Sequence, residues 1–511
     1  MELNLLRTDL IQPREYQLKI AETASNKNTL VVLPTGTGKT LISLLVGINR
    51  LEKYPDSKIL ITSPTRPLNA QHKKSFEKFT KINPEEIVLI TGKVKPEERE
   101  EIYKKAKIIV ATPQCIEYDI ENGRLSLENF SFVAFDEAHR AVKEYSYPYI
   151  AKKYMLQSRY PLILGLTASP GGSPERIKEI CGNLFIKAVE IRTEVDEDLK
   201  KYMMPVETEF IYVELPEEFT RLITLLEEAL EDDLNWLKEH KYTFMHKPTK
   251  KMLLELQKKL INSYMRGSKG AYWAIVHVAS AIKLEHAIEL LEVQGTPFLY
   301  EFLKKVFSSN KKTDRRVASD PRVREVFKLV EELYSRVEHP KLQKILFVVK
   351  DLLKENPSAK IIVFANYRAT VNKIREMLVQ NSIKSEILIG QAVKNGKGMS
   401  QQQQIEILKD FKEGRFNVLV ASSIGEEGVD YYADFAVFYE AVPSEIRALQ
   451  RRGRVGRHAA GKIIFLITKG TLDEAYYWAA FKKEKKMKGM LYRMKEKGVK
   501  REKKSLIDWL R

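Results

Sequence analysis

The feature that most constrains the fold of this chain is a glycine-rich turn that follows an apolar run near the N-terminus. Residues 29–33 are Thr-Leu-Val-Val-Leu, and residues 34–40 are Pro-Thr-Gly-Thr-Gly-Lys-Thr. When a buried strand enters such a turn and a helix follows, backbone N–H groups surround phosphates, Lys39 reaches the β- and γ-phosphates, and Thr40 ligates Mg²⁺. The segment therefore predicts an α/β domain that binds a nucleoside triphosphate. Because Leu33 stands where the strict GxxxxGK[ST] pattern has glycine, a surface turn is the alternative.

An acidic motif about a hundred residues later predicts the other half of such a site. Residues 136–139 are Asp-Glu-Ala-His and follow the apolar run 132–135. A carboxylate at the end of a second strand can hold the same Mg²⁺ through Asp136, and Glu137 can orient the attacking water. Alone, this motif could be an ordinary strand end. Both motifs, each behind a buried-strand signal and in this order, predict hydrolysis of a nucleoside triphosphate.

Length, charge and cysteine content narrow the class of protein. At 511 residues the chain is expected to form two to four domains. Its net charge of +18 favours a polyanionic partner such as nucleic acid, with a Lys/Glu-rich solvated surface of a heat-stable protein as the alternative. Two cysteines, Cys115 and Cys181, cannot form a four-cysteine metal site.

Hydropathy predicts a soluble intracellular protein, cytoplasmic in a prokaryote or nuclear in a eukaryote. No stretch approaches the roughly 18–20 apolar residues that a membrane span needs, so no membrane partner is expected. The N-terminal residues 1–4 lack the basic region and apolar core of a signal peptide.

Hydrophobic periodicity divides the chain into four segments. Short apolar runs alternate with helix-like stretches in residues 1–205 and again in 340–480, which predicts two α/β domains with parallel sheets. Long amphipathic helices without strands fill 206–339, so this segment is expected to be an all-helical insertion. The tail 481–511 is strongly basic and is expected to be a helix on nucleic acid or a linker. The expected strands are 29–33, 58–62, 86–90, 107–110, 131–135, 162–166, 360–364, 417–421, 435–439 and 462–467.

An arginine-rich segment predicts charge supplied to the phosphates from the second α/β domain. Residues 450–457 are Gln-Arg-Arg-Gly-Arg-Val-Gly-Arg. Arg454 and Arg457 are three residues apart and lie on one side of a helical turn, so both can face a γ-phosphate across a domain cleft; Gln450 is placed in the same catalytic set. An arginine finger of this kind raises turnover by roughly 10³–10⁵. A phosphate-binding surface without a catalytic part is the alternative.

These motifs, taken in order, resemble a superfamily 2 DEAH-box helicase. The resemblance implies two RecA-like P-loop domains with parallel sheets and an all-helical insertion between them, with ATP and Mg²⁺ as cofactors. It implies ATP contacts from Arg14, Gln17, Thr35, Gly36, Thr37, Gly38, Gly428 and Asp430. It implies coupling of hydrolysis to movement through His139, Thr167 and Ser169. It implies sequence-independent contacts to strand phosphates from Thr65, Arg66, Thr91, Gly92, Thr112, Tyr367, Arg368 and Ser422.

A narrower resemblance is to the branch of the archaeal Hef helicases and FANCM. It is carried by Gly-Met-Ser-Gln at 398–401, the run 417–420, Gly-Glu-Glu-Gly at 425–428 and the long helical insertion. The resemblance implies an ATP-dependent DNA helicase or translocase on forked or branched DNA in DNA repair, with 3′→5′ polarity. A duplex-RNA-activated ATPase of the RIG-I or Dicer type and a scaffold without ATPase activity are the alternatives. Because the chain has no ERKxxxD motif, we expect no nuclease activity here and a nuclease, if any, as a C-terminal domain or partner.

Basic and aromatic side chains of the insertion are the candidates for substrate choice. The resemblance implies contacts with duplex arms, for which the candidates are Lys269, Lys311, Lys312, Arg315 and Arg316. Tyr272 and Trp273 are candidates for stacking on an opened base. Packing of these two rings in the helical core, and ordinary solvated loops for the basic residues, are the alternatives.

Overall fold

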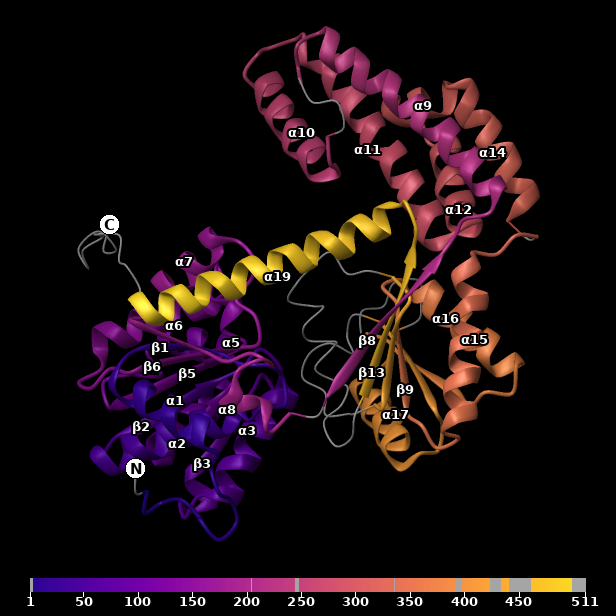
Figure 1. Cartoon of the computed structure of the whole chain (residues 1–511). Coiled ribbons are helices and arrows are strands. Elements are labelled where there is room, and N and C mark those ends of the chain that lie inside the picture. The colour runs from indigo at the N-terminus through magenta and orange to yellow at the C-terminus, as the bar shows by residue number, and fades with distance from the viewer. Residues whose placement is uncertain are drawn as a thin grey trace.

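The computed structural model describes residues 3–203, 205–243, 248–334, 336–390, 398–422, 433–440 and 461–498. Two parallel sheets and a helical bundle make up this part of the chain (Figure 1), which confirms the predicted fold class. No helix among the described residues is both long and apolar enough to cross a membrane.

The first sheet has seven parallel strands in the order β3-β4-β2-β5-β6-β1-β7. The central strands are buried on both faces because they are continuous apolar runs, as in β5, which is buried along its whole length. The strands are β1 (Thr29–Val32), β2 (Lys58–Thr62), β3 (Ile87–Ile90), β4 (Ile108–Ala111), β5 (Phe130–Asp136), β6 (Ile163–Thr167) and β7 (Ala188–Ile191). The helices around it are α1 (Glu15–Asn26), α2 (Lys39–Lys53), α3 (Arg66–Phe79), α4 (Pro96–Lys105), α5 (Pro113–Glu121), α6 (Ser146–Gln157), α7 (Pro174–Asn183) and α8 (Glu197–Lys200), with 3₁₀ turns η1 (Pro84–Glu86) and η2 (Ala138–Arg140).

The second sheet has six strands in the order β10-β11-β9-β12-β13-β8. Its strands are β8 (Val206–Val213), β9 (Ile361–Phe364), β10 (Ser385–Leu388), β11 (Val418–Ala421), β12 (Phe435–Phe438) and β13 (Gly461–Thr468). Its helices are α15 (Pro340–Glu355), α16 (Arg368–Gln380) and α17 (Gln401–Glu413).

Strand β8 differs from the sequence prediction, which placed residues 206–213 in the helical insertion. It pairs in parallel with β13 along its full length, from Val206 opposite Gly461 to Val213 opposite Thr468. The strand lies at the edge of the sheet and most of its residues are exposed, so it lacks the continuous apolar run that marks a buried strand. The bundle therefore starts after β8 and is inserted within the second α/β domain.

The helical bundle is fixed to the second domain by a buried polar network at the end of α11. The bundle consists of α9 (Glu217–Glu239), α10 (Lys250–Met265), α11 (Ala271–Gln294), α12 (Thr296–Phe307), α13 (Lys312–Ser319) and α14 (Pro321–Leu333). The Gln294 side chain donates to the Glu440 carboxylate over 2.8 Å and accepts from the Thr370 hydroxyl. The His339 ring lies 2.8 Å from the Glu292 carbonyl oxygen. These groups are buried, so bundle and second domain form one packed unit.

A long C-terminal helix connects this unit to the first domain. Helix α19 (Leu472–Lys497) begins beside the second sheet and runs across the molecule to α6 and α7 of the first domain (Figure 1). Its far half contributes Met487 and Leu491 to the core around the first sheet, and the Tyr492 hydroxyl bonds to the Asp196 carboxylate. Part of the basic tail expected from the sequence is thus a helix docked on protein. Residues after 498 lie outside the described residues.

The carboxyl group of Glu292 gives the joint between bundle and second domain a pH dependence. Burial raises its pKa to about 7; the Leu472 N–H bond opposes this shift, and carboxylates such as Glu227 and Asp473 add to it. Because the pKa is higher in the folded than in the unfolded chain, the stabilisation is full below pH 4–5 and is lost as the pH rises through 7, by up to about 3 kcal/mol.

We expect the Glu292→Gln variant to melt at a higher temperature than the parent at pH 8 and at a similar temperature at pH 5. Scanning calorimetry at both pH values measures this difference. Glu301→Gln, on the exposed face of α12, is the matched control and is expected to change neither value. A wild-type melting temperature above that of Glu292→Gln at pH 8 would contradict the prediction.

Candidate active site

Two groups of predicted residues lie side by side at the carboxyl ends of the strands of the first sheet. The nucleotide motifs follow β1, β5 and β6, and the strand-contact motifs follow β2, β3 and β4. In the strand order β3-β4-β2-β5-β6-β1-β7, these two groups occupy opposite halves that meet between β2 and β5. A parallel sheet brings such ends to one edge, where ligands bind.

The glycine-rich turn has the backbone that a phosphate loop requires. Gly36 and Gly38 have φ of 81° and 82°, in the left-handed region that favours glycine. A Cβ on Gly38 would also lie 2.4 Å from the Gln17 amide nitrogen, so the position excludes a side chain on two grounds. Lys39 starts α2 and its Nζ donates to the carbonyls of Leu33 and Pro34, at 3.0 and 3.1 Å, which keeps the cation over the loop.

Residues of α1 hold this loop in place through hydrogen bonds to its backbone. The Gln17 amide donates to the Thr37 carbonyl over 3.2 Å and accepts from the Arg14 backbone N–H over 2.9 Å, and the Tyr16 hydroxyl donates to the same Thr37 carbonyl. The Arg14 guanidinium lies 4.7 Å from the centroid of the Tyr202 ring. Both ends of the Gln17 amide thus have partners in the protein. The resemblance implies that Gln17 and Arg14 contact adenine. For Gln17, such a contact would replace one of these two hydrogen bonds.

Asp136 lies at the end of β5 and is held as a carboxylate. Burial raises its pKa, but the hydrogen bond from His72, the positive charge of Lys39 and the Glu137 N–H together bring the pKa below its usual value. The His72 Nε2 is 3.0 Å from Asp136 Oδ2. Glu137 has a left-handed backbone with φ of 51°, a conformation that costs a non-glycine residue about 1–2 kcal/mol and is typical of functional sites.

The residues of this edge fit a Mg²⁺-bound triphosphate. The Thr35 hydroxyl oxygen is buried without a hydrogen-bond partner and lies in the loop that would surround the phosphates. Thr40 and the ionised Asp136 offer the oxygen ligands that Mg²⁺ prefers. Lys39 supplies the cation opposite the phosphates. We assign these roles as proposals for the residues that the sequence predicted.

The three predicted coupling residues form a connected path that starts at the acidic motif. His139 Nδ1 lies 3.2 Å from Glu137 Oε2 and 3.3 Å from Thr167 Oγ1. Thr167 exchanges hydrogen bonds with Ser169, and the Ser169 hydroxyl is 3.1 Å from the sulfur of Met487 on α19. The path therefore runs from the Glu137 carboxylate to α19, the helix that crosses to the second domain.

The predicted strand-contact residues of the first domain line the other half of the edge. Thr65 caps α3, with its hydroxyl accepting from the Leu68 N–H, and Arg66 is exposed. The Arg66 guanidinium lies beside the Cα of Gly92, since a Cβ there would be 3.5 Å from its Nη2. Thr91 and Thr112 follow β3 and β4 and are largely buried, with the Thr112 hydroxyl 3.2 Å from the Cys115 sulfur.

The predicted contacts of the second domain follow β9 and β11 at the corresponding edge of its sheet. Tyr367 caps α16 and is partly exposed, and burial raises the pKa of its hydroxyl to about 12. The Arg368 guanidinium donates to the Gly390 carbonyl over 3.0 Å. Ser422 is buried after β11. The other predicted residues of this half, Gly428, Asp430, Gln450, Arg454 and Arg457, lie outside the described residues.

The basic candidates of the bundle divide into two kinds. The Arg316 guanidinium lies 2.6 Å from Asp233, a buried carboxylate that also bonds His277, which favours a structural role over a contact with DNA. The other basic candidates are exposed, namely Lys269, Lys311, Lys312 and Arg315.

Sequence reasoning missed His72, which joins the two halves of the edge. It projects from α3, the helix that Thr65 caps, and its ring is 99% buried against Asp136. On the same helix, Asn69 donates to the carbonyls of Ser63 and Thr65, at 2.8 and 3.0 Å. One helix thus holds both the strand-contact loop and the predicted Mg²⁺ ligand. One feature of the sequence could have indicated this contact: Asn69 and His72 are polar but stand three residues apart, on the face of α3 that is buried.

We expect His72→Ala to lower kcat for ATP hydrolysis about ten-fold and to raise the Mg²⁺ concentration that gives half the maximal rate. The reason is the loss of a hydrogen bond to a charged group, which is worth about 1.5–3 kcal/mol. His72→Gln keeps a donor at a similar reach and should recover part of the rate, which a purely structural loss would not explain. Steady-state assays with a Mg²⁺ titration measure both values, with the exposed His240→Ala as control; an unchanged Mg²⁺ dependence would contradict the assignment.

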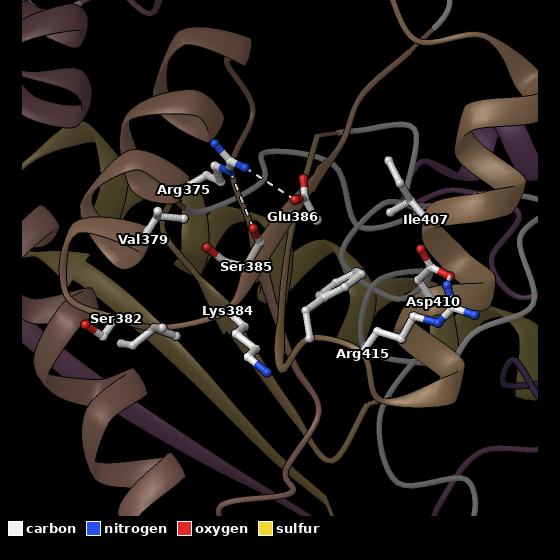
Figure 2. Close-up of a pocket in the computed structure, with 11 residues that line it drawn as sticks. Arg375, Val379, Ser382, Lys384, Ser385, Glu386, Ile407, Asp410 and Arg415 are labelled. Atoms are coloured by element: carbon white, nitrogen blue, oxygen red, sulfur yellow. Dashed lines mark hydrogen bonds and ion pairs between the residues drawn. The ribbon is translucent and has the colours of Figure 1, made fainter.

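A cavity of about 630 Å³ in the second domain is separate from this site. It lies between α16 and α17 at the edge strand β10 (Figure 2). Four of its charged lining residues form two ion pairs, with Arg375 3.3 Å from Glu386 and Arg415 3.0 Å from Asp410. None of the predicted site residues lines it.

Three family models match successive parts of the chain. Residues 14–177 match the model of the DEAD/DEAH box helicases, and residues 343–459 match that of the helicase conserved C-terminal domain. Residues 218–335, the bundle, match the model described as "Putative ATP-dependent RNA helicase, helical bundle".

Similarity in sequence and structure to known proteins covers nearly the whole chain. The crystal structure of the Pyrococcus furiosus Hef helicase domain is 43% identical with a TM-score of 0.73, and covers 93% of this chain and 99% of that one. A Methanocaldococcus jannaschii protein named "Putative ATP-dependent RNA helicase MJ1505" is 44% identical over 97% of this chain and 62% of its own length. The "ATP-dependent DNA helicase fml1" of Schizosaccharomyces pombe is 32% identical over 89% of this chain and 57% of its own length. The chain thus spans about three fifths of these two curated relatives.

Proposed function

The chain belongs to the DEAD/DEAH box helicases, in the branch represented by the Hef helicase domain, and on that premise we propose that it is an ATP-driven motor on forked or branched DNA. We further propose that it moves 3′→5′, that it serves DNA repair inside the cell, and that any nuclease working with it is a partner domain or protein. The relatives named as DNA helicases support DNA as the substrate.

The observation that carries the proposal is the shared edge of the first sheet. Half of this edge holds the phosphate loop and Asp136, and the other half holds a row of hydroxyl and backbone N–H groups at Thr65, Thr91 and Thr112. Hydroxyls and N–H groups suit phosphates and carry no base information, so binding is sequence-independent and salt-sensitive. A metabolic ATPase has no need of the second half.

Each residue of the first half has a task in hydrolysis under this proposal. Lys39 turns from the loop carbonyls to the β- and γ-phosphates, and Glu137 orients the attacking water. Thr40 and Asp136 would hold Mg²⁺, which neutralises phosphate charge when it is bound. His139 and Thr167 connect Glu137 to Ser169, so a change at the γ-phosphate reaches α19 through contacts that exist already.

On the nucleic-acid side, α3 transmits strand binding to the nucleotide site. A phosphate held at the start of α3 fixes the position of the helix, and the helix fixes His72 against Asp136. Bound strand therefore stabilises the arrangement in which Asp136 faces the metal. This predicts hydrolysis that is slow alone and faster with nucleic acid.

Duplex RNA is the second candidate substrate. One specific observation favours it: the Methanocaldococcus jannaschii relative and the bundle model both carry names of RNA helicases. The contacts of the first domain are to phosphates and do not separate DNA from RNA.

Steady-state ATPase at fixed salt with single-stranded DNA, linear duplex DNA, forked DNA and duplex RNA tests the proposal. We expect the greatest stimulation with forked DNA, followed by strand displacement on the same fork. Greatest stimulation with duplex RNA would replace the proposal by the second candidate. Absence of hydrolysis with all four would leave a nucleic-acid-binding scaffold.

A further inference from the structure

The end of the bundle that is away from the motor domains carries an exposed aromatic and basic surface. We call it the tip and define it as residues 264–273, which join α10 to α11, together with Lys311 and Lys312. Two of its large apolar side chains face solvent, since Met265 is 80% exposed and Trp273 60%. In Figure 1 the connection of α10 to α11 lies at the end of the bundle opposite the second sheet, and the other end of α11 is the one bonded to Glu440.

Trp273 is not part of the helical core, contrary to one of the two interpretations of the sequence. Its ring makes an edge contact with Tyr272 at 5.6 Å between centroids and leaves more than half of its surface to solvent. Tyr272 in turn lies 6.0 Å from Tyr264, and the Lys312 ammonium is 5.2 Å from the Tyr272 centroid. Exposed apolar patches of this kind on soluble proteins mark binding sites.

The segment that joins α10 to α11 carries only positive charge. Residues 256–284 contain no Asp or Glu. The exposed basic residues of the tip and of the last turns of α10 are Lys258, Lys259, Arg266, Lys269, Lys311 and Lys312. A positive surface with an exposed aromatic ring suits single-stranded nucleic acid, because phosphates bind the cations and an unstacked base covers the ring. A duplex offers the phosphates but keeps its bases stacked.

We propose that the tip binds single-stranded nucleic acid, with a base stacked on Trp273 and phosphates on Arg266, Lys269 and Lys312. Gln294 follows Trp273 by 21 residues along α11, which sets the tip about 30 Å from the surface of the second domain. This inference rests on the proposed function in one respect: the motor grips one strand of a fork, and the tip holds the strand that has been separated from it.

Fluorescence of the full chain tests binding at the tip directly. Titration with oligothymidine should quench the emission of the parent protein, and Trp273→Phe should lose that quenching. In a binding assay, Trp273→Ala should bind a fork with a single-stranded arm about ten-fold more weakly and a fork with two duplex arms as tightly as the parent. Phe347→Ala, which removes another aromatic ring that is 60% exposed, is the matched control on α15.

The outcomes separate this inference from the proposed function. Equal binding of both forks by Trp273→Ala, or quenching by anionic lipid vesicles in place of oligothymidine, would overturn the inference. ATPase stimulated by DNA without quenching at Trp273 would overturn it and leave the motor intact. Quenching lost in Trp273→Phe, without DNA-stimulated ATPase in the parent, would support the tip and reject the motor.

Discussion

Replacing Lys39 by alanine is expected to lower the rate of ATP hydrolysis by at least about a hundred-fold and to leave binding of single-stranded DNA within two- to three-fold of the parent. The Lys39 ammonium donates to the Leu33 and Pro34 carbonyls, which place it over the loop where the phosphates would bind. Removing one preorganised charge from a phosphoryl-transfer site costs about 10²–10³ in rate. The strand-contact residues lie on the other half of the sheet edge and keep their environment.

Two assays on the same preparation measure these effects. ATP turnover is followed with saturating single-stranded DNA, and DNA binding is followed by anisotropy without nucleotide. Lys19→Ala, which removes an exposed lysine paired with Glu15 on α1, is the control for loss of a positive charge in the first domain. Normal turnover by Lys39→Ala would reject the whole assignment of the nucleotide site.

The largest expected effect on stability comes from the ion pair at the root of α19. Lys341 and Asp473 are 0% and 1% exposed, and their Nζ and Oδ2 atoms are 2.5 Å apart. Lys341 also donates to the Tyr439 carbonyl over 2.8 Å. Asp473→Asn leaves the ammonium buried without a counter-charge, which destabilises by about 3–5 kcal/mol. We expect a lower melting temperature and faster proteolysis of α19.

A double variant makes this prediction specific to the buried charge. Lys341→Met combined with Asp473→Leu fills the same space with apolar side chains and should recover much of the lost stability, since such replacements are often neutral or stabilising. Glu214→Gln breaks an ion pair with Lys469 that is exposed on both sides and should change the melting temperature little. An Asp473→Asn variant as stable as the parent would show that Lys341 finds another partner.

Buried strands were predictable from the sequence, and of the four edge strands only β3 was. The central strands are continuous apolar runs, so a window of about five residues is enough to recognise each of them. In β7 partly buried residues alternate with buried ones, β8 is buried only at Val213, and β10 is short and bordered by polar residues, so no continuous apolar run marks these three strands. Their identity as strands depends on partners that are far away in sequence, such as β13 for β8.

The residues of the candidate site likewise fall into those that a local pattern predicts and those that only contacts distant in sequence reveal. The phosphate loop and the acidic motif are local patterns whose chemistry follows from adjacent residues. His72 reaches Asp136 across 64 residues and Met487 reaches Ser169 across 318, and no local spacing indicates either contact. Arg316, a candidate for a DNA contact, has its guanidinium held by Asp233, 83 residues away, which no local spacing indicates.

The two crossings of the chain between its α/β domains constrain how those domains move. The chain leaves the first sheet after β7 to enter the second at β8, and it returns through α19, whose far half is packed in the first core. A body attached at one point can turn about three axes, whereas a body attached at two separate points turns only about the line that joins them. We infer that the second domain and its bundle rotate relative to the first domain about the line that joins these two connections. The direction of that line depends on where the β7–β8 connection and α19 cross between the domains, so covalent connectivity contributes to the direction of domain rotation.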